Sequence, residues 1–227
     1  MEPLLSIIIP TKNEEQYLPL LLESIKKQAS WVEIIVADNN STDKTVEIAK
    51  QYNAKIVKGG SPESGRNNGA RIASTEYLLF LDADCILPPG FLKDNFSEFK
   101  QRRKECATTY LAPLTKNGFD HFIYGYFWNW FYFFSHKFSP YAAGFCIFST
   151  KQYFHKKGGF SLHLIAGSSR AYVRKSEFGL LHGPKVFVST RQFQKELRLM
   201  FLFKKCAGFV HQVFFGDIKK PFLFFTK

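Results

Sequence analysis

An uninterrupted apolar run at residues 77–81 is the feature that most constrains how this 227-residue chain can fold. The run reads Tyr-Leu-Leu-Phe-Leu and has the length of one β-strand. Because both of its faces are apolar, it predicts a strand buried on both sides, as in a parallel sheet. Two carboxylates, Asp82 and Asp84, follow directly. A buried strand has no place for them in its interior, so we expect both at its carboxyl end, where open α/β sheets bind their ligands.

Two carboxylates on a short turn suit a hard divalent cation. Mg²⁺ and Mn²⁺ prefer oxygen ligands and commonly fill their remaining positions with water and phosphate oxygens. Asp82 and Asp84 are therefore the candidate metal ligands, with Mn²⁺ or Mg²⁺ as the cofactor. The alternative is an ordinary solvated turn, since an Asp-x-Asp pair is common. The pattern upstream favours the metal.

Strands and helices alternate over the first part of the chain. Apolar runs of strand length recur at residues 4–9, 33–37 and 54–58. Helical spacing of apolar residues follows the first two of them, and a helix through Ile72 and Ala73 is expected before the strand at 77–81. Ser41 or Thr42 is the expected cap of the second helix, and residues 59–69 are expected to be the loop that opens the third. This alternation predicts an α/β fold with a mostly parallel sheet.

Polar loops follow three of these strands and should meet at one edge of the sheet. They cover residues 11–14, 38–43 and 82–84. Asp38 can accept a hydrogen bond from the imide of a base or from a ribose hydroxyl, and Arg66 can pair with a base or a phosphate. No Gly-x-Gly-x-x-Gly follows the first strand, and no Gly-Lys-Ser/Thr is present, so neither a dinucleotide fingerprint nor a P-loop is predicted.

Residues 6–91 resemble the inverting, family-2 type of nucleotide-sugar glycosyltransferases. The resemblance rests on four motifs in order: Ser6–Glu14, Asp38–Asp43, Gly65–Gly69 and the metal motif Asp82-Ala83-Asp84. It implies a GT-A fold, a mostly parallel twisted sheet flanked by helices. It also implies that Asp84 binds the metal directly, that Asp82 is a second ligand or a ribose contact, and that Asp38 holds the base. The nucleotide-sugar site it implies consists of Pro10, Thr11, Lys12, Asn13, Glu14, Asp38, Asn39, Arg66, Asn67, Asp82, Ala83 and Asp84.

The acceptor side departs from the family pattern. Gly158 and Gly159 resemble the family's glycine turn near the donor sugar and acceptor. In the segment after Gly167 the family usually carries Glu-Asp, one of which is the general base, whereas this chain has Ser168 and Ser169. Serine at its ordinary pKa cannot serve as that base at neutral pH. Arg170 and Arg174 make the segment cationic and are candidate acceptor-side residues.

Three explanations of this departure stay open. The acceptor could be a phosphate such as polyprenyl phosphate, which needs no base. The chain could be a catalytically silent, membrane-associated relative that binds nucleotide sugars. Or the base could come from elsewhere in the fold.

Aromatic residues and positive charge gather in the second half of the chain. The formal net charge is +12, and residues 119–134 are dominated by Phe, Tyr and Trp. That stretch is too short to cross a bilayer but suits an in-plane helix at an anionic membrane surface, with Trp128 and Trp130 at the interface. A core helix under the acceptor site is the alternative. In the tail after residue 196, aromatics are interleaved with lysines, which suits an anionic lipid surface and also single-stranded nucleic acid. No nucleic-acid motif accompanies them, so no nucleic acid is expected as a partner.

These features predict one GT-A domain with an aromatic, membrane-facing extension. We expect the nucleotide-sugar-binding part at residues 1–115, the acceptor-side part at 116–190 and a basic, aromatic tail at 191–227. The predicted function is metal-dependent transfer of a sugar from a nucleotide diphosphate donor to a membrane-embedded acceptor, a lipid or polyprenyl phosphate. Four cysteines without zinc or redox spacing and the lack of a signal-peptide pattern favour a cytoplasmic protein, peripheral or monotopic at the cytoplasmic face of a membrane.

Overall fold

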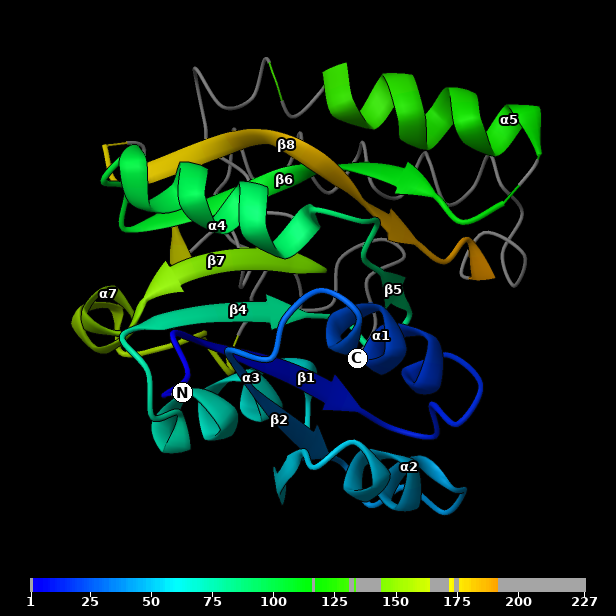
Figure 1. The fold of residues 1–227 in the computed structure, drawn as a ribbon, viewed down its shortest axis with the longest axis vertical. Helices are drawn as coiled ribbons and strands as arrows, with labels where there is room; N and C mark the ends of the chain where they lie inside the picture. Colours follow the sequence, from blue (N-terminus) through cyan, green and yellow to red (C-terminus); the bar gives the residue numbers. More distant parts are fainter. Residues whose placement is uncertain are drawn as a thin grey trace.

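The fold is one mixed sheet with helices on both faces (Figure 1). The structure, a computed structural model, describes residues 2–115, 117–130, 133, 144–163, 172–173 and 176–191. In this part of the chain eight strands pair in the order β3-β2-β1-β4-β7-β6-β8-β5. The strands are β1 (Leu5–Thr11), β2 (Val32–Asp38), β3 (Lys55–Lys58), β4 (Tyr77–Leu81), β5 (Cys85–Ile86), β6 (Cys106–Pro113), β7 (Cys146–Thr150) and β8 (Phe178–Val188).

The first four strands form the parallel half of the sheet, as the sequence predicts. β2 and β4 flank β1, and β3 pairs with β2, all in parallel. The connecting helices are α1 (Leu18–Lys26), α2 (Thr45–Gln51) and α3 (Pro62–Ile72). The register places Thr11, the last residue of β1, beside Asp38, the last residue of β2. The carboxyl ends of these strands therefore meet at one edge, and the predicted α/β class is confirmed.

The other half of the sheet is mixed. β7 is antiparallel to both β4 and β6, β8 runs parallel to β6, and the short β5 pairs antiparallel with the end of β8. Helix α4 (Phe91–Gln101) packs against β8, and α7 (Lys151–Lys157) follows β7. Because β5 directly follows the Asp82–Asp84 turn, its pairing brings the end of β8 next to that turn.

Alternate residues of the central strands enter two separate cores. Ile7 and Ile9 of β1 face α1 and α4 and belong to one cluster, whereas Ile8 belongs to the other, with residues of α3 and α7. Phe80 of β4 is fully buried on the second side. A strand covered on both faces reads as continuously apolar, which is why residues 77–81 gave so clear a pattern.

Helix α3 corrects the expectation of a loop at residues 59–69. The helix begins at Pro62, three residues before Gly65, because the Ser61 side chain accepts a hydrogen bond from Ser64 N and caps it. Gly65 and Gly69 then lie inside the helix, and a Cβ at Gly69 would clash with the side chain of Ile8. These glycines allow close packing of the helix on β1; they do not make a turn.

The expected cap of α2 by Ser41 or Thr42 is not found: the N-cap residue is Lys44, and its side chain makes no capping hydrogen bond. Asp43, and neither Ser41 nor Thr42, accepts the hydrogen bond from Thr45 N at 3.0 Å. The hydroxyl of Ser41 is used by Asp38 instead, at 2.5 Å. Ser41 therefore supports Asp38, and Asp43 supports the first residue of α2.

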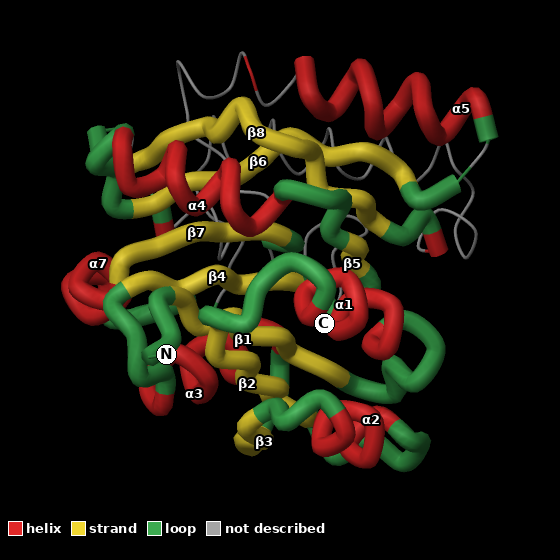
Figure 2. Tube along the Cα trace, in the orientation of Figure 1, coloured by secondary structure: helices red, strands yellow, loops and turns green. Residues whose placement is uncertain are grey.

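The aromatic stretch forms a helix on the β6 side of the sheet, made of α5 (Gly118–Asp120) and the π-helical η1 (His121–Trp128), labelled α5 in Figure 2. Its inner face is core: Ile123 and Trp128 are buried, and the Asn129 side chain bonds the backbone of Leu111 in both directions. Large side chains on its outer face are exposed: Phe119, Phe122, Tyr126 and, two residues beyond η1, Trp130. Of the two expected interfacial tryptophans, only Trp130 lies outside the core.

Within the described ranges, no helix is long and apolar enough to cross a membrane. Residues 131–132, 134–143, 164–171, 174–175 and 192–227 lie outside them, and with them most of the predicted tail.

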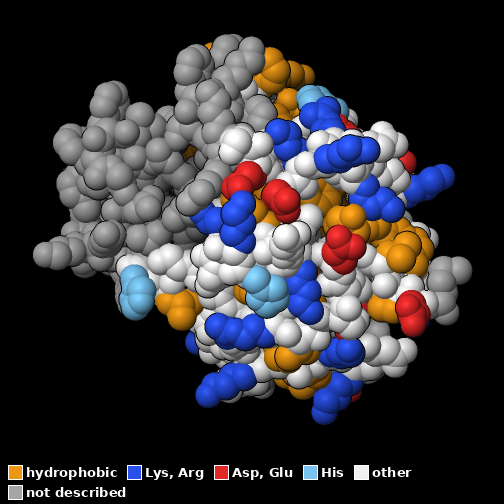
Figure 3. Space-filling model, turned by 90° about the vertical axis from the view of Figure 1, so that its left-hand side faces the viewer, with side chains coloured by type: hydrophobic (Ala, Val, Ile, Leu, Met, Phe, Trp, Pro, Cys, Tyr) orange, Lys and Arg blue, Asp and Glu red, His pale blue; other side chains and the backbone are white. Residues whose placement is uncertain are grey.

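Positive charge is spread widely over the surface. Figure 3 shows the side of the molecule that carries α7, where Lys and Arg side chains are scattered between neutral ones. Lys156 and Lys157 in the last turn of α7 contribute to it, and Lys156 pairs with Glu177 at 2.8 Å. This side faces away from the carboxyl ends of the parallel strands.

Candidate active site

Asp38 sits at the centre of the first part of the site, at the carboxyl end of β2. Its carboxylate accepts hydrogen bonds from Thr11 Oγ1 at 3.1 Å and from the backbone N–H of Ser41 at 2.9 Å, besides the Ser41 hydroxyl. The backbone of Gly59 lies so close to Asp38 that any side chain there would strike the main chain. Asp38 is therefore held in one orientation and remains half-buried.

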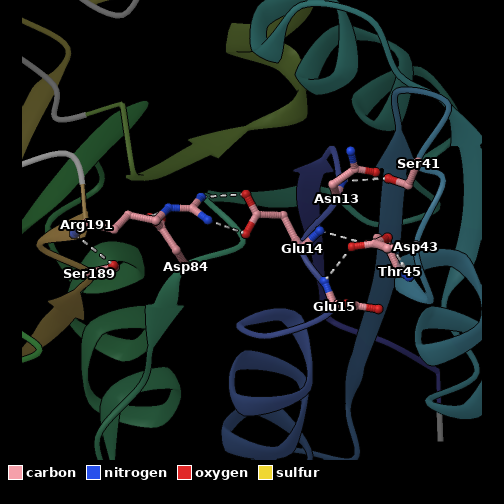
Figure 4. Close-up of polar contacts among 9 residues, drawn as sticks. All are labelled: Asn13, Glu14, Glu15, Ser41, Asp43, Thr45, Asp84, Ser189 and Arg191. Atoms are coloured by element: carbon pink, nitrogen blue, oxygen red, sulfur yellow. Dashed lines mark hydrogen bonds and ion pairs between the residues drawn. The ribbon is translucent and has the colours of Figure 1, made fainter. Parts of the chain in front are cut away.

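The loop after β1 is clamped to the loop after β2 (Figure 4). Asn13 has a left-handed φ of 54°, and its amide oxygen accepts from Thr42 N at 2.9 Å while its own N–H donates to Ser41 Oγ. The backbone N–H of Glu14 donates to Thr45 Oγ1 at 2.8 Å. These bonds fix the backbone of Glu14 and leave its carboxylate to point across the edge toward Asp84.

Asp82 is held by Arg66. The Arg66 guanidinium donates to Asp82 Oδ1 at 2.6 Å and to the carbonyl of Gly144 at 2.9 Å, and lies over the ring of Phe160. The Arg66 side chain is 5% exposed, so this cation is a buried, fixed part of the site. The structure thus places Arg66 on a predicted metal ligand; contact with a base or phosphate stays a prediction.

Asp84 is held by a residue that sequence reasoning missed. Arg191, three residues beyond β8, forms an ion pair with Asp84, with its Nε 3.1 Å from Asp84 Oδ2, and its two other nitrogens form a fork on the Glu14 carboxylate at 2.9 and 2.5 Å (Figure 4). The backbone N–H of Ser189 also donates to Asp84 O. Arg191 and Glu14 are 177 residues apart. No spacing in the sequence could have joined them.

Burial and neighbouring negative charge together raise the pKa of Asp84 to about 6. Burial is the larger cause; the carboxylates of Asp82 and Glu14 add to it, and the Arg191 guanidinium works against it. A raised pKa means that the ionised form of Asp84 is under-stabilised by the protein alone. A second positive group beside it would reverse that effect.

The raised pKa of Asp84 and the oxygen donors beside it fit a site for a divalent cation. Asp82 and Asp84 offer hard oxygen donors where negative charge is in excess. No three His, Cys, Asp or Glu residues of the described chain are grouped closely enough to hold a metal by themselves. An ion here would need further oxygens from elsewhere, as Mg²⁺ and Mn²⁺ sites at nucleotide phosphates usually do.

The predicted third motif and the glycine turn are brought together. Asn67 of α3 donates to Phe160 O at 2.9 Å and accepts from Phe160 N at 2.8 Å. Gly159 lies against the Asn67 side chain with a φ of 82°, and Gly158, also left-handed, ends α7. Asn67 is thereby used structurally, to fix the turn.

The other residues predicted for the nucleotide-sugar site differ in how exposed they are. Pro10 is half-buried, Ala83 is buried, Lys12 is exposed, and Asn39 is half-buried with its N–H on Thr11 O at 2.9 Å. Ser168, Ser169, Arg170 and Arg174 lie outside the described residues.

A mostly parallel sheet with Asp38, Asp82 and Asp84 at its carboxyl edge is the arrangement expected of the GT-A class of α/β proteins, whose fold this chain shares. The chain belongs to glycosyl transferase family 2, whose model matches residues 6–158. The predicted family and fold are therefore confirmed.

Named relatives match a part of the chain. It is 39% identical over 92 residues to 4,4'-diaponeurosporenoate glycosyltransferase of Staphylococcus haemolyticus, a match covering 37% of this chain and 24% of that protein. It is 35% identical over 100 residues to poly(ribitol-phosphate) beta-N-acetylglucosaminyltransferase TarS of Staphylococcus aureus, covering 39% and 18%. The matched part thus spans about a quarter or less of these relatives' length.

Solved structures share the fold over most of the chain. The crystal structure of S. aureus TarS matches 89% of this chain and 65% of its own with a TM-score of 0.63 at 21% identity. Mannosyltransferase PcManGT from Pyrobaculum calidifontis, solved in complex with GDP-Man and Mn²⁺, matches 83% and 57% with a TM-score of 0.64 at 19% identity.

Proposed function

We propose that this chain transfers a sugar from a nucleoside diphosphate donor, with Mn²⁺ or Mg²⁺, to a membrane-embedded acceptor, a lipid or polyprenyl phosphate. The observation that carries the proposal is the carboxyl edge of the sheet. Asp38 stands there beside the loop clamp, Asp82 is paired with Arg66, and Glu14 and Asp84 share the Arg191 guanidinium. One part is suited to a nucleoside and the other to a metal diphosphate.

In this proposal Asp38 binds the nucleoside. Its carboxylate is fixed by Thr11 and Ser41, and a carboxylate in one orientation can select a base imide or a ribose diol by hydrogen bonding. Asn39 and the exposed Lys12 line the same edge.

Asp82 and Asp84 hold the divalent ion. When bound, the ion neutralises the departing diphosphate, which is the main electrostatic requirement of such a transfer. The chain's own task is to fix the two carboxylates: Arg66 orients Asp82, and the pairing of β5 with β8 fixes the backbone of Asp84. Inversion at the anomeric carbon follows from the family resemblance alone.

The membrane part of the proposal rests on the outer face of the α5–η1 helix. Its exposed aromatics recur at intervals of three or four residues and so share one face of the helix. Trp and Tyr favour the membrane–water interface, and a net charge of +12 favours an anionic surface. A helix of this kind would hold the protein peripherally at the cytoplasmic face, beside its acceptor.

A silent nucleotide-sugar-binding protein is the second candidate. It is favoured by one observation, the serines at positions 168 and 169 in place of the family's acidic pair. Binding without turnover would distinguish it from the enzyme.

Calorimetry with UDP and GDP, with and without Mn²⁺, tests the roles at the sheet edge. Asp84→Asn should abolish the metal-dependent part of binding, whereas Asp38→Asn should weaken binding with or without metal. Asp94→Asn, an equal charge change at an exposed position in the first turn of α4, is the control and should bind as the native chain does. Undiminished Mn²⁺-dependent binding by Asp84→Asn would refute the metal assignment. Loss of only the metal-dependent part in Asp38→Asn would refute the nucleoside role.

A further inference from the structure

We infer that Arg191 is a donor-binding residue that serves as the counterion of Asp84 until a divalent ion arrives, and that it then pairs with the donor's diphosphate. The inference rests on the proposed function for the identity of the donor. Its starting point is the geometry around the guanidinium, which contacts Glu14 and Asp84 at once (Figure 4).

A divalent ion at Asp84 would compete with a cation already at the site. Three carboxylates, Glu14, Asp82 and Asp84, face two guanidiniums, Arg66 and Arg191, which leaves one negative charge. A divalent ion bound to Asp84 in addition would leave the cluster positive and would place two cations against one carboxylate. Two cations on the same carboxylate repel each other, and the repulsion is stronger in a partly buried site than in water.

Arg191 is the cation able to move. Arg66 is 5% exposed and is tied to Asp82, to the carbonyl of Gly144 and to the ring of Phe160. Arg191 is 32% exposed, and its contact with Asp84 uses Nε alone, at 3.1 Å. Its stronger fork is on Glu14, and its guanidinium also lies over the ring of Tyr17, 5.1 Å from the centroid. Release from Asp84 therefore costs one contact and leaves two in place.

The same fork keeps the freed guanidinium at the metal site. Glu14 is held by the clamp between the first two loops, so an Arg191 still paired with it stays beside Asp84. A diphosphate whose oxygens bind a metal on Asp84 would lie within reach of that guanidinium. Arginine is well suited to the planar, two-point contacts that phosphate oxygens accept. Arg191 would then stabilise the leaving group together with the ion.

The test compares Mn²⁺ binding with nucleotide binding, because the two should change in opposite directions. Arg191→Gln keeps the size and polarity of the side chain but removes its charge. Mn²⁺ alone, followed by electron paramagnetic resonance, should bind this variant roughly 5- to 30-fold more tightly than the native chain, because the competing cation is gone. With Mn²⁺ saturating, the tighter of UDP and GDP should bind it more weakly by a similar factor. Arg191→Lys, which keeps the charge without the fork, should lie between the two.

Arg71→Gln is the matched control. Arg71 is an exposed arginine of α3 that contacts Asn68, and its loss should change neither affinity. Thermal unfolding of all variants shows which of them are folded, and Arg191→Lys replaces Arg191→Gln in the comparison if the latter does not fold.

Each remaining outcome overturns part of the inference. Mn²⁺ affinity of Arg191→Gln that is unchanged or weaker would mean that Arg191 only supports the structure. Tighter Mn²⁺ with unchanged nucleotide affinity would remove the diphosphate contact. A native chain that binds neither UDP nor GDP would refute the proposed function and the diphosphate contact together, and Mn²⁺ alone would then decide whether Arg191 is a counterion.

Discussion

Single residues decide how closely the elements of this fold approach one another. Gly69 of α3 lies against Ile8, which is fully buried and branched at Cβ, so neither partner can give way easily. Gly69→Ala should therefore destabilise the protein by about 1–3 kcal/mol, the usual range for overpacking. Urea unfolding measures it. Gly125→Ala is the control: nothing lies within 4 Å of a Cβ at Gly125, and alanine there should be neutral or stabilising by up to about 1 kcal/mol. Equal stabilities for the two variants would contradict this account of α3.

Glu33 lies near the amino end of β2, away from the site, and should make the stability of the protein depend on pH in the acid range. Burial raises its pKa, but hydrogen bonds from Lys55, Ser6 and Ser74 outweigh burial and hold the pKa below the ordinary 4.5. A carboxyl with a lowered pKa stabilises the fold above its unfolded pKa and loses that contribution as pH falls through the folded value. Glu33→Gln should thus cost about 1.5–3 kcal/mol at pH 7 and much less at a pH well below 4.5, where Glu33 is protonated in the folded protein as well.

Unfolding by urea at both pH values checks this. Glu47→Gln, an exposed change on α2, should show no such dependence on pH. A cost for Glu33→Gln that is equal at the two pH values would show that the charge of Glu33 does not matter.

The residues that the sequence could predict are those at strand ends. Asp38, Asp82 and Asp84 follow apolar runs directly, so their place at the sheet edge is a matter of local pattern. The fork between Glu14 and Arg191 was out of reach, because it depends on where β8 finishes after the whole sheet has formed. Asn67 was assigned to the nucleotide site by resemblance, and the structure shows the backbone of Phe160 as its partner.

At the scale of elements, the strands were easier to predict than the helices. Parallel strands covered on both faces leave long apolar runs, and β1, β2, β3 and β4 were found within two residues of their ends. Helix α3 was partly missed because Gly65, Asn67, Asn68 and Gly69 disfavour helix by local preference, and packing against β1 overrides that preference.

The aromatic helix gives the prediction that belongs to this scale. Replacing Phe122, Tyr126 and Trp130 by Ser should lower binding to vesicles containing phosphatidylglycerol at least about tenfold, because each exposed ring contributes apolar area at the interface. Leu20→Ser with Ile72→Ser is the control, since these are also exposed large apolar residues but lie on α1 and α3. Sedimentation measures binding, and high salt should release the native chain in part. Equal loss in both variants would mean that the helix has no special role at the membrane.

The whole molecule must bring donor, acceptor and membrane together, and the serines at 168 and 169 bear on which acceptor it uses. If the acceptor is a lipid phosphate, an ionised oxygen attacks without a base. A hydroxyl acceptor would forgo general-base catalysis, worth roughly 10²–10⁴-fold. Ser169→Asp should therefore help transfer to a glycolipid alcohol and hinder transfer to polyprenyl phosphate through like-charge repulsion.

Transfer to both acceptors, measured for the native chain and for Ser169→Asp, decides between these readings of the acceptor side. Native transfer to the alcohol alone would exclude the phosphate acceptor and require another base. Tight donor binding without transfer to either would favour the silent binding protein.

The surface charge also acts on this scale. Lys and Arg side chains are scattered over the side of the molecule shown in Figure 3, so the attraction to an anionic surface there is diffuse and dependent on salt. Diffuse charge can bring the protein to a membrane, and the aromatic helix would then set its orientation.

The contact between Glu14 and Arg191 has a consequence for synthesis of the chain. β1 to β4 are complete once residue 81 has left the ribosome, and this parallel half has its own helices. The carboxylates of Glu14 and Asp84 nevertheless gain their shared partner only when Arg191 is synthesised, the last of the described residues. Until then the carboxylates of Glu14 and Asp84 lack the Arg191 guanidinium, so the site is complete only after the whole sheet has been translated.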